Sequence, residues 1–214
     1  MKIKKIILIG GGGHCCSVID VILTENKFEI IGIIDKEENI GKSVLGFPII
    51  GSDNDIANIS INSPNFIITI GQIKNNQNRV KLYNILKSLN LNLPVIVSPK
   101  AYVSKYSEIN EGTVIMHNAF INARAVINHN CIINTNSIIE HDVIIGEHSH
   151  VSTGAIINGE CIIGANSFIG SNSVIINGIK LGQNSIIGAG SVVISDLPGN
   201  AVYAGIPAKK ITNI

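Results

Sequence analysis

The stretch Ser137–Gly170, SIIEHDVIIGEHSHVSTGAIINGECIIGANSFIG, places an aliphatic residue at every sixth position, and this spacing decides the fold. The same spacing extends in both directions, from Val103 to Val193. Its sixteen members are all aliphatic, and fifteen of them are β-branched. β-Branched side chains favour strands, and a fixed period is typical of repeat architectures. The sequence therefore predicts an uninterrupted hexapeptide-repeat solenoid from about Ala101 to Ile194.

A second column of residues, two positions before each aliphatic one, consists mainly of Ala, Ser, Thr, Cys and Val. We expect one aliphatic side chain per strand to point inward and the small residue to turn the corner. Three strands then close a coil of about eighteen residues, and stacked coils bury one continuous aliphatic column. Cys131 and Cys161 fall in the small column, where plain packing is favoured over a reactive role.

The overall composition excludes several classes of protein. The chain has 214 residues, of which 45% are apolar and 14% charged, so it can form a core and shows little sign of disorder. The net charge of +1 argues against a nucleic-acid partner, because phosphate binding needs clustered Lys and Arg. The longest apolar run is too short to span a membrane. The four cysteines fit neither a zinc site nor a disulfide framework, so we expect no metal and a cytoplasmic location.

The first hundred residues alternate between strand and helix patterns. Strands are predicted over 6–9, 29–34, 66–70 and 93–97, with helices from the glycine loop to about residue 25 and over 76–89. Such alternation predicts a small parallel α/β sheet. We divide the chain into an α/β domain over 1–98 and a solenoid domain with a C-terminal cap over 99–214.

The glycine loop after the first predicted strand, IGGGGH, suggests a binding site. Gly10 and Gly12 match a dinucleotide fingerprint, but Cys15 occupies its third glycine position and the second half of such a fold is missing, so a dehydrogenase is disfavoured. The N–H groups of Gly12, Gly13 and His14 at a helix start suit a phosphate or polar ligand. Asp35, at a strand end, can accept hydrogen bonds from a sugar or base. A tight turn without a ligand remains the alternative. The adjacent Cys15 and Cys16 are expected to pack rather than react.

Histidine is the natural candidate for a base that titrates near neutrality. His117, His129 and His141 share one phase of the repeat, where side chains point outward. His141 is flanked by Glu140 and Asp142, and a carboxylate beside an imidazole can fix its tautomer and raise its basicity. A solvent-facing histidine without a role is the alternative.

The whole chain resembles sugar-modifying acetyltransferases of the sialic-acid O-acetyltransferase type and the bacillosamine and perosamine N-acetyltransferase type. The matching motifs are IGGGGH with Asp35, GFPIIGS (46–52), TIG (69–71), IIEHDVIIGEHSHVSTGA (138–155) and LPGNAVYAGIPAKKI (197–211). The resemblance implies a Rossmann-like N-terminal domain followed by a left-handed parallel β-helix. It also implies a homotrimer with each active site between neighbouring β-helices.

The resemblance assigns roles to individual residues. His141 would be the general base and Asp142 its partner, although relatives carry Glu there and Glu140 is the other candidate. The nucleotide-sugar residues would be Gly12, Gly13, His14, Asp35, Lys36, Gly71 and Asn134. The acetyl-CoA residues would be His150, Gly159, Gly170, Ser171, Gly188, Ala189 and Lys209, with Lys210 beside it. Cys15 replaces the Gly or Ala usual after the histidine, a change that narrows the expected pocket.

Three functions remain open from the sequence. The favoured one is acetyl-CoA-dependent N-acetylation of the 4-amino group of a nucleotide-linked 4-amino-4,6-dideoxy sugar, in surface-glycan biosynthesis, with UDP placed before GDP or dTDP. The second is O-acetylation of sialic acid or a related sugar acid. The third is a non-catalytic nucleotide sensor or scaffold trimer.

Overall fold

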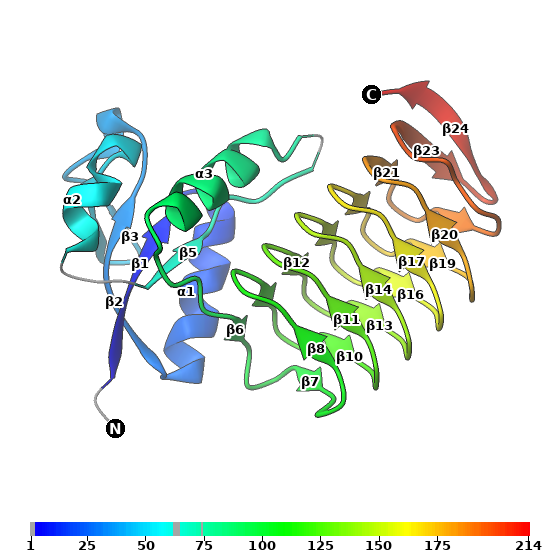
Figure 1. Ribbon diagram of the computed structural model, residues 1–214, viewed down its shortest axis with the longest axis horizontal. Helices are drawn as coiled ribbons and strands as arrows, with labels where there is room; N and C mark the ends of the chain where they lie inside the picture. Colours follow the sequence, from blue (N-terminus) through cyan, green and yellow to red (C-terminus); the bar gives the residue numbers. More distant parts are fainter. Residues whose placement is uncertain (1–2, 62–64, 74) are drawn as a thin grey trace.

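The computed structural model describes residues 3–61, 65–73 and 75–214. An α/β region is followed by a stack of coils that runs to the C-terminus (Figure 1). Within the described residues, no helix has the length and apolar character needed to cross a membrane.

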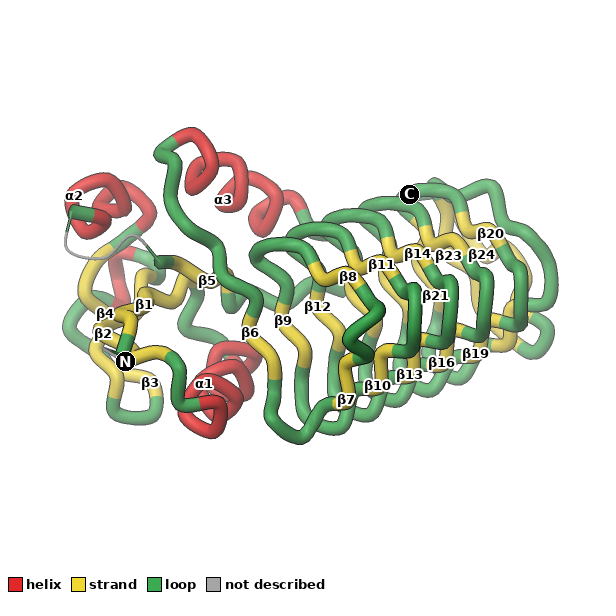
Figure 2. Tube along the Cα trace, turned by 60° about the horizontal axis from the view of Figure 1, so that its bottom comes forward, coloured by secondary structure: helices red, strands yellow, loops and turns green. Residues whose placement is uncertain are grey.

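The N-terminal region is a five-stranded sheet of order β3-β4-β2-β1-β5, covered by helices on both faces (Figure 2). Its strands are β1 (Lys4–Ile9), β2 (Phe28–Ile34), β3 (Ser43–Val44), β4 (Phe47–Gly51) and β5 (Phe66–Ile68), and its helices are α1 (Gly13–Glu25), α2 (Ile56–Ser60) and α3 (Gln77–Ser88), with 3-10 turns at Glu37–Asn39 and Asp53–Asp55. All pairings are parallel except β3 with β4. Alternate side chains of β1 reach opposite faces: Ile6 and Leu8 pack in the cluster of α1, and Ile7 and Ile9 in that of α3.

The C-terminal region is a β-helix with three parallel faces. Face 1 contains β7 (Tyr102–Val103), β10 (Phe120–Ile121), β13 (Ile138–Ile139), β16 (Ile156–Ile157), β19 (Val174–Ile175) and β22 (Val192–Val193). Face 2 contains β8 (Glu108–Ile109), β11 (Val126–Ile127), β14 (Ile144–Ile145), β17 (Ile162–Ile163) and β20 (Lys180–Leu181). Face 3 contains β6 (Ile96–Val97), β9 (Val114–Ile115), β12 (Ile132–Ile133), β15 (His150–Val151), β18 (Phe168–Ile169), β21 (Ser185–Ile187) and the final hairpin β23 (Ala201–Gly205) and β24 (Ala208–Asn213). Tyr102 pairs with Phe120, so one coil takes the predicted eighteen residues.

Three edges join these faces and serve as landmarks below. Edge A consists of the turns from face 1 to face 2, which include residues 122–124, 140–142 and 158–160. Edge B joins face 2 to face 3 and includes 128–130, 146–148 and 164–166. Edge C joins face 3 to face 1 and includes 134–136, 152–154, 170–172 and 188–190.

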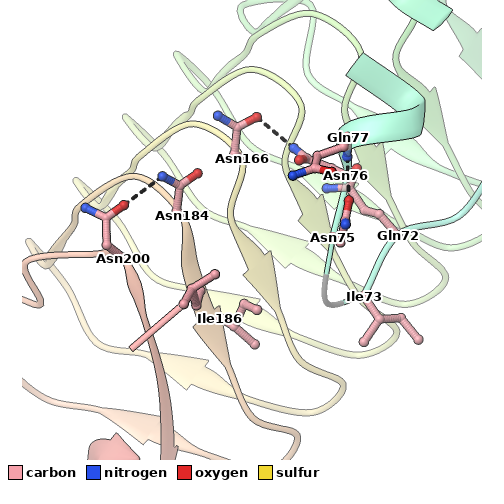
Figure 3. A pocket seen from close by; sticks show the side chains of 10 residues that line it. Gln72, Ile73, Asn75, Asn76, Gln77, Asn166, Asn184, Ile186 and Asn200 are labelled. Carbon is pink, nitrogen blue, oxygen red and sulfur yellow. Dashed lines mark hydrogen bonds between the residues drawn. The ribbon is translucent and has the colours of Figure 1, made fainter. Parts of the chain in front are cut away.

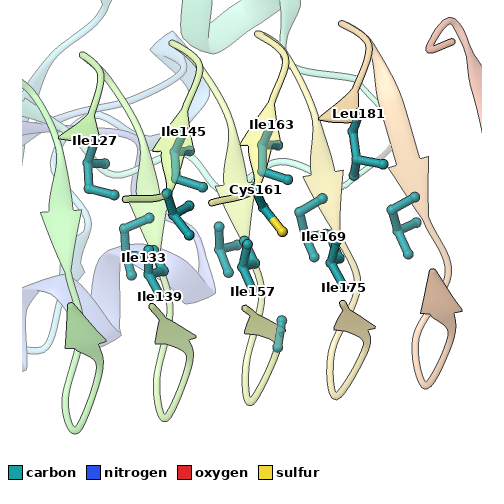
Figure 4. Close-up of a cluster of buried hydrophobic side chains, with 14 of the residues drawn as sticks. Ile127, Ile133, Ile139, Ile145, Ile157, Cys161, Ile163, Ile169, Ile175 and Leu181 are labelled. Atoms are coloured by element: carbon teal, nitrogen blue, oxygen red, sulfur yellow. The ribbon is translucent and has the colours of Figure 1, made fainter. Parts of the chain in front are cut away.

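The aliphatic column predicted from the sequence forms the core of the β-helix (Figure 4). From Ile115 onward its members are nearly inaccessible, and Cys131 and Cys161 are fully buried in the same cluster. Burial raises the pKa of the Cys131 thiol to about 12 and also raises that of Cys161. The packing interpretation of these two cysteines is confirmed.

The corners are turned by a residue that the hexad analysis did not single out. From Ile109 to Ile187, the third position after each aliphatic residue has a left-handed backbone, with φ between 54° and 73°, at Gly112, Asn118, Arg124, Asn130, Asn136, Asp142, His148, Gly154, Glu160, Asn166, Asn172, Gly178, Asn184 and Gly190. Gly, and less often Asn or Asp, adopts this conformation at low cost. The column of Asn and Gly was the sequence signal for these corners.

Two N-terminal predictions need correction. The strand predicted over 93–97 was assigned to the α/β sheet, but β6 pairs with β9 and begins the β-helix. Strand β6 of the β-helix therefore lies on the N-terminal side of the domain boundary that we predict after residue 98. That boundary stays a prediction. The hairpin β3–β4 and the short helix α2 were not predicted, because their strands and helix are too short to show a period.

Candidate active site

Edge A holds His141 in a charged cluster that spans two coils. The Nδ1–H of His141 donates to Asp142 Oδ2 over 2.8 Å. Asp142 also accepts two bonds from Arg124, from Nε to Oδ1 over 2.6 Å and from Nη2 to Oδ2 over 2.8 Å. Arg124 and then His141 hold the pKa of the Asp142 carboxyl well below its usual range. With Nδ1 carrying the proton toward Asp142, the free lone pair of the neutral ring is on Nε2.

The partner of His141 is therefore Asp142 rather than Glu140. Glu140 accepts a 2.6 Å hydrogen bond from Asn122 Nδ2, one coil earlier. The shorter Asp side chain reaches the ring because the two residues are adjacent on the turn and Arg124 holds the carboxylate from the other side.

Gly159 lies directly under the imidazole, one coil after His141. A Cβ at this position would lie 2.6 Å from His141 Cε1 and 2.7 Å from Nε2, so any side chain here would displace the imidazole. The carbonyl of Gly159 accepts from Gly178, while the described residues offer its N–H no acceptor. The free lone pair of His141 and this N–H thus share one region of edge A.

The glycine loop separates two clefts on the N-terminal region. The first, about 530 Å³, is lined by Gly10, Asp35, Lys36, Ser52 and Asp53 among others, and we call it the Asp35 cleft. A Cβ on Gly11 would lie 2.8 Å from Asp35 Oδ2, whereas one on Gly12 or Gly13 would meet nothing within 4 Å. The loop therefore leaves open space at the start of α1, where backbone N–H groups attract an anion.

The second cleft, about 580 Å³, lies where the loop meets edge C of the β-helix. We call it the Asn134 cleft, and its lining is Gly13, His14, Ser17, Gly71, Gln72, Ile73, Asn134, Thr135, His150 and Thr153. Five of these ten residues were named from the sequence, and the structure brings them together: Gly13, His14, Gly71, Asn134 and His150. The lining consists mostly of neutral hydrogen-bonding groups, which match the hydroxyl groups of a sugar ring.

Two polar atoms near this cleft are buried and have no hydrogen-bond partner among the described residues: His14 Nε2 and Gln72 Oε1. Burial, reinforced by Arg79 and His150, lowers the pKa of His14 to about 3, so its ring is neutral. Buried polar atoms without partners are rare in folded proteins. They are therefore candidate hydrogen-bond partners for a ligand in the Asn134 cleft.

His150 is buried and already uses both ring nitrogens. Its Nδ1–H donates to the carbonyl of Gln72 over 2.7 Å, and its Nε2 accepts from Asn134 Nδ2 over 3.2 Å. Burial lowers the pKa of His150 to about 4. It is therefore a neutral residue that orients Asn134 and cannot serve as the solvent-exposed base.

The remaining predicted residues divide between two edges. Gly170, Ser171, Gly188 and Ala189 lie on edge C, whereas Gly159 lies on edge A beside His141. A Cβ on Gly170 would collide with backbone atoms of the next coil, so close stacking also requires this glycine. Lys209 and Lys210 are exposed on β24.

His117 and His129 contact the N-terminal region. His117 is hydrogen-bonded to Ser98 and Asp20, and the ring of His129 stacks on that of Tyr83.

Several functional candidates were missed from the sequence. Gln72 fixes His150 through its carbonyl and donates from Nε2 to the carbonyl of His148. Arg79, 1% exposed, donates to the carbonyls of Ile68 and Ile70 at the end of β5 and to that of Asn130 on edge B.

Cys15 is fully buried and its pKa is raised to about 11, mainly by burial, so the packing interpretation of this residue is confirmed.

A third cleft, about 350 Å³, follows edge B and is rich in amides (Figure 3). Asn76 donates to Asn166 and Asn184 donates to Asn200, both over 2.7 Å. Asn166, Asn184 and Asn200 all have left-handed backbones, which explains the choice of Asn at these corners.

Comparisons with known proteins agree with this geometry. A model of the PglD N-terminal domain matches residues 5–86, and a model of the bacterial transferase hexapeptide repeat matches residues 160–195. A search of curated proteins finds no match. PerB from Caulobacter crescentus, solved in complex with CoA and GDP-perosamine, is 30% identical, with a TM-score of 0.91 and 98% of each chain covered. The H141N mutant of perosamine N-acetyltransferase from the same organism, with the same ligands, is 29% identical, with a TM-score of 0.92 over 99% of this chain and 98% of that chain.

The acetyltransferase domain of PglB from Neisseria gonorrhoeae is also similar, at 30% identity and a TM-score of 0.88, covering 97% of this chain and 100% of that chain. Both regions of the chain are thus matched, the α/β region and the β-helix, in one continuous similarity. The chain belongs to the hexapeptide-repeat sugar N-acetyltransferases of the perosamine and bacillosamine type.

Proposed function

We propose that this protein transfers the acetyl group of acetyl-CoA to the 4-amino group of a nucleotide-linked 4-amino-4,6-dideoxy sugar. The observation that carries the proposal is the cluster on edge A, where Asp142 fixes the tautomer of His141 and leaves Nε2 free above Gly159. An amine nucleophile needs a base of this kind, and a developing oxyanion needs an N–H donor close by. PerB and its variants were solved with CoA and GDP-perosamine, and PglB was solved with acetyl coenzyme A.

The glycine loop lies between the two clefts, and this arrangement suits a nucleotide sugar. The Asp35 cleft would hold the ribose and base, with carboxylates as hydrogen-bond acceptors. The open N–H groups of Gly12 and Gly13 would bind the diphosphate. The Asn134 cleft would hold the sugar, and the unpartnered His14 Nε2 and Gln72 Oε1 would bond its hydroxyl groups.

In the chemical step, the sugar nitrogen forms a bond to the thioester carbonyl carbon and the carbon–sulfur bond breaks. His141 Nε2 takes the proton lost by the nitrogen and passes it to the departing sulfur, so the products are the N-acetylated sugar and the CoA thiol. Asp142 stabilises the imidazolium that forms. The N–H of Gly159 polarises the carbonyl. No acyl-enzyme is needed.

We further propose that the site is completed by a second copy of the chain in a homotrimer. His141 and Gly159 lie on edge A, but the Asn134 cleft and the predicted CoA residues Ser171 and Ala189 lie on edge C. These edges flank face 1, whose outward side chains are apolar: Tyr102, Phe120, Ile138, Ile156, Val174 and Val192. Packing of face 1 around a threefold axis would bury this surface and bring edge A of one copy to edge C of the next.

The activity test is release of the CoA thiol from acetyl-CoA across a panel of UDP-, GDP- and dTDP-linked 4-amino sugars. We expect turnover with one of the three series, and His141→Ala should lower kcat by about 10²–10⁴-fold while leaving nucleotide-sugar binding intact. Retained activity in this variant would refute the role of His141, and no turnover with any amino sugar would refute the substrate class.

The alternative substrate, a sialic or related sugar acid, carries a carboxylate. The described lining of the Asn134 cleft offers neutral amide, hydroxyl and imidazole groups instead, which favours the amino sugar. Titration with free UDP, GDP and dTDP separates the two substrates, because an enzyme for free sugar acids would bind none of them.

All four cysteines are free thiols, which supports a reducing compartment such as the cytoplasm.

A further inference from the structure

Arg124 is exposed on edge A, one coil before the proposed base, and it was not identified from the sequence. Its guanidinium makes a bidentate pair with Asp142, at 2.6 and 2.8 Å. Oδ2 of Asp142 is shared, since it accepts both from Arg124 Nη2 and from His141 Nδ1. The three residues thus form a single chain of charge-assisted hydrogen bonds that ends at the imidazole.

The backbone supplies an independent observation. Arg124 has φ 61°, in the left-handed region that is unfavourable for residues other than Gly, Asn and Asp. Among the left-handed corners of residues 112–190, only Arg124, His148 and Glu160 carry a side chain outside that group. Strained positions of this kind persist where the surrounding structure holds them, and they cluster at functional sites.

We propose that Arg124 is a positioning residue for the acetyl transfer: it holds the Asp142 carboxylate where that group orients His141, and it sets how strongly the carboxylate favours the protonated ring. This inference rests on the proposed function of His141 as the base. The bidentate geometry explains why arginine is present, because a lysine ammonium cannot make two parallel bonds to one carboxylate.

The neighbouring charges define what the removal of Arg124 would do. Glu160, at the matching corner two coils after Arg124, attracts Arg124 at longer range, and Glu140 is engaged by Asn122. Without the guanidinium, Asp142 would have His141 as its remaining ion-pairing partner. The carboxylate would then stabilise the imidazolium more strongly, and a higher pH would be needed to obtain the neutral base.

The decisive variant is Arg124→Asn, because Asn suits the left-handed backbone and lacks the guanidinium. We expect its thermal midpoint to equal or exceed that of the wild type. We expect kcat at neutral pH to fall about 5–20-fold, and the acid limb of the kcat–pH profile to move up by about one unit. Glu160→Asn is the matched control of opposite charge, since it makes the same backbone change two coils from Arg124 and removes an anion rather than a cation, and its acid limb should not move up. Arg124→Lys should keep the position of the limb and lose part of kcat.

Two results would overturn the proposal. An unchanged acid limb in Arg124→Asn, with His141→Ala inactive, would leave the proposed function intact and refute the role of Arg124. An unchanged limb with a raised KM for acetyl-CoA would show that Arg124 binds the cosubstrate instead. If His141→Ala were active, the proposed function itself would fail, so the two failures are distinguishable.

Discussion

Replacing Gly159 by Ala tests the geometry of the proposed base with the addition of one methyl group. The added Cβ would lie 2.6 Å from His141 Cε1 and 2.7 Å from Nε2. Carbon atoms pack at about 3.5–4.0 Å, so the ring must retreat by about 1 Å. A displacement of this size at a reacting group costs on the order of 10²-fold in rate. We therefore expect kcat to fall about 100-fold, equivalent to about 2.7 kcal/mol of transition-state stabilisation.

The fold should tolerate this change. Gly159 does not have a left-handed backbone, and Ala occupies the matching turn position at residues 123, 165 and 189. Asn177→Ala is the matched control, because it makes an alanine at the same position one coil later. Steady-state thiol release and a thermal melt of each variant provide the measurement. A Gly159→Ala protein that folds normally and keeps more than half of the wild-type kcat would refute the placement of His141 above Gly159.

Three further predictions follow from the buried groups and from Asp142. Burial lowers the pKa of His150 to about 4, so below about pH 6.5 the unfolded state binds more protons than the folded state. The free energy of unfolding therefore decreases as the pH is lowered. Between pH 7 and pH 5, this residue alone should lower the free energy of unfolding, measured with urea, by about 2 kcal/mol. A pH-independent midpoint over that range would contradict the burial of His150. Cys131 and Cys161 should not react with a thiol reagent in the native protein and should do so in urea; labelling of either without denaturant would be inconsistent with the core. Asp142→Asn should lower kcat about 10–100-fold with KM values near normal, since the amide no longer stabilises the imidazolium; a normal kcat would show that the contact has no catalytic role.

Much of the β-helix could be predicted because each inward position repeats an identical environment. Residues eighteen apart stack on one another, as Phe120 does on Tyr102, so every coil imposes the same requirement for an aliphatic residue. The same stacking would have predicted part of the candidate site. Arg124, Asp142 and Glu160 are separated by eighteen residues, and so are His141 and Gly159. The contacts of Asp142 with Arg124 and of His141 with Gly159 follow once the coil length is known.

Contacts between the two regions could not be predicted in this way. Gln72 reaches His150 across 78 residues and Arg79 reaches Asn130 across 51, with no period connecting them. The histidines show the consequence. His117, His129 and His141 share one phase of the repeat, but packing of the N-terminal region against face 3 and edges B and C covers the first two and leaves His141 about half exposed.

In the proposed trimer, the base on edge A of one copy serves the sugar cleft on edge C of the next, and mixed trimers test this arrangement most directly. His141→Ala removes the base, and Thr153→Trp fills the Asn134 cleft; each variant alone should be inactive. Co-expression of the two with different tags, followed by tandem purification, gives trimers that contain both. Every trimer that contains both variants pairs an intact edge A with an intact edge C at one of its three sites, so we expect about one third of wild-type kcat. Mixed trimers without activity would show that both edges of one chain form the site, and would contradict the account.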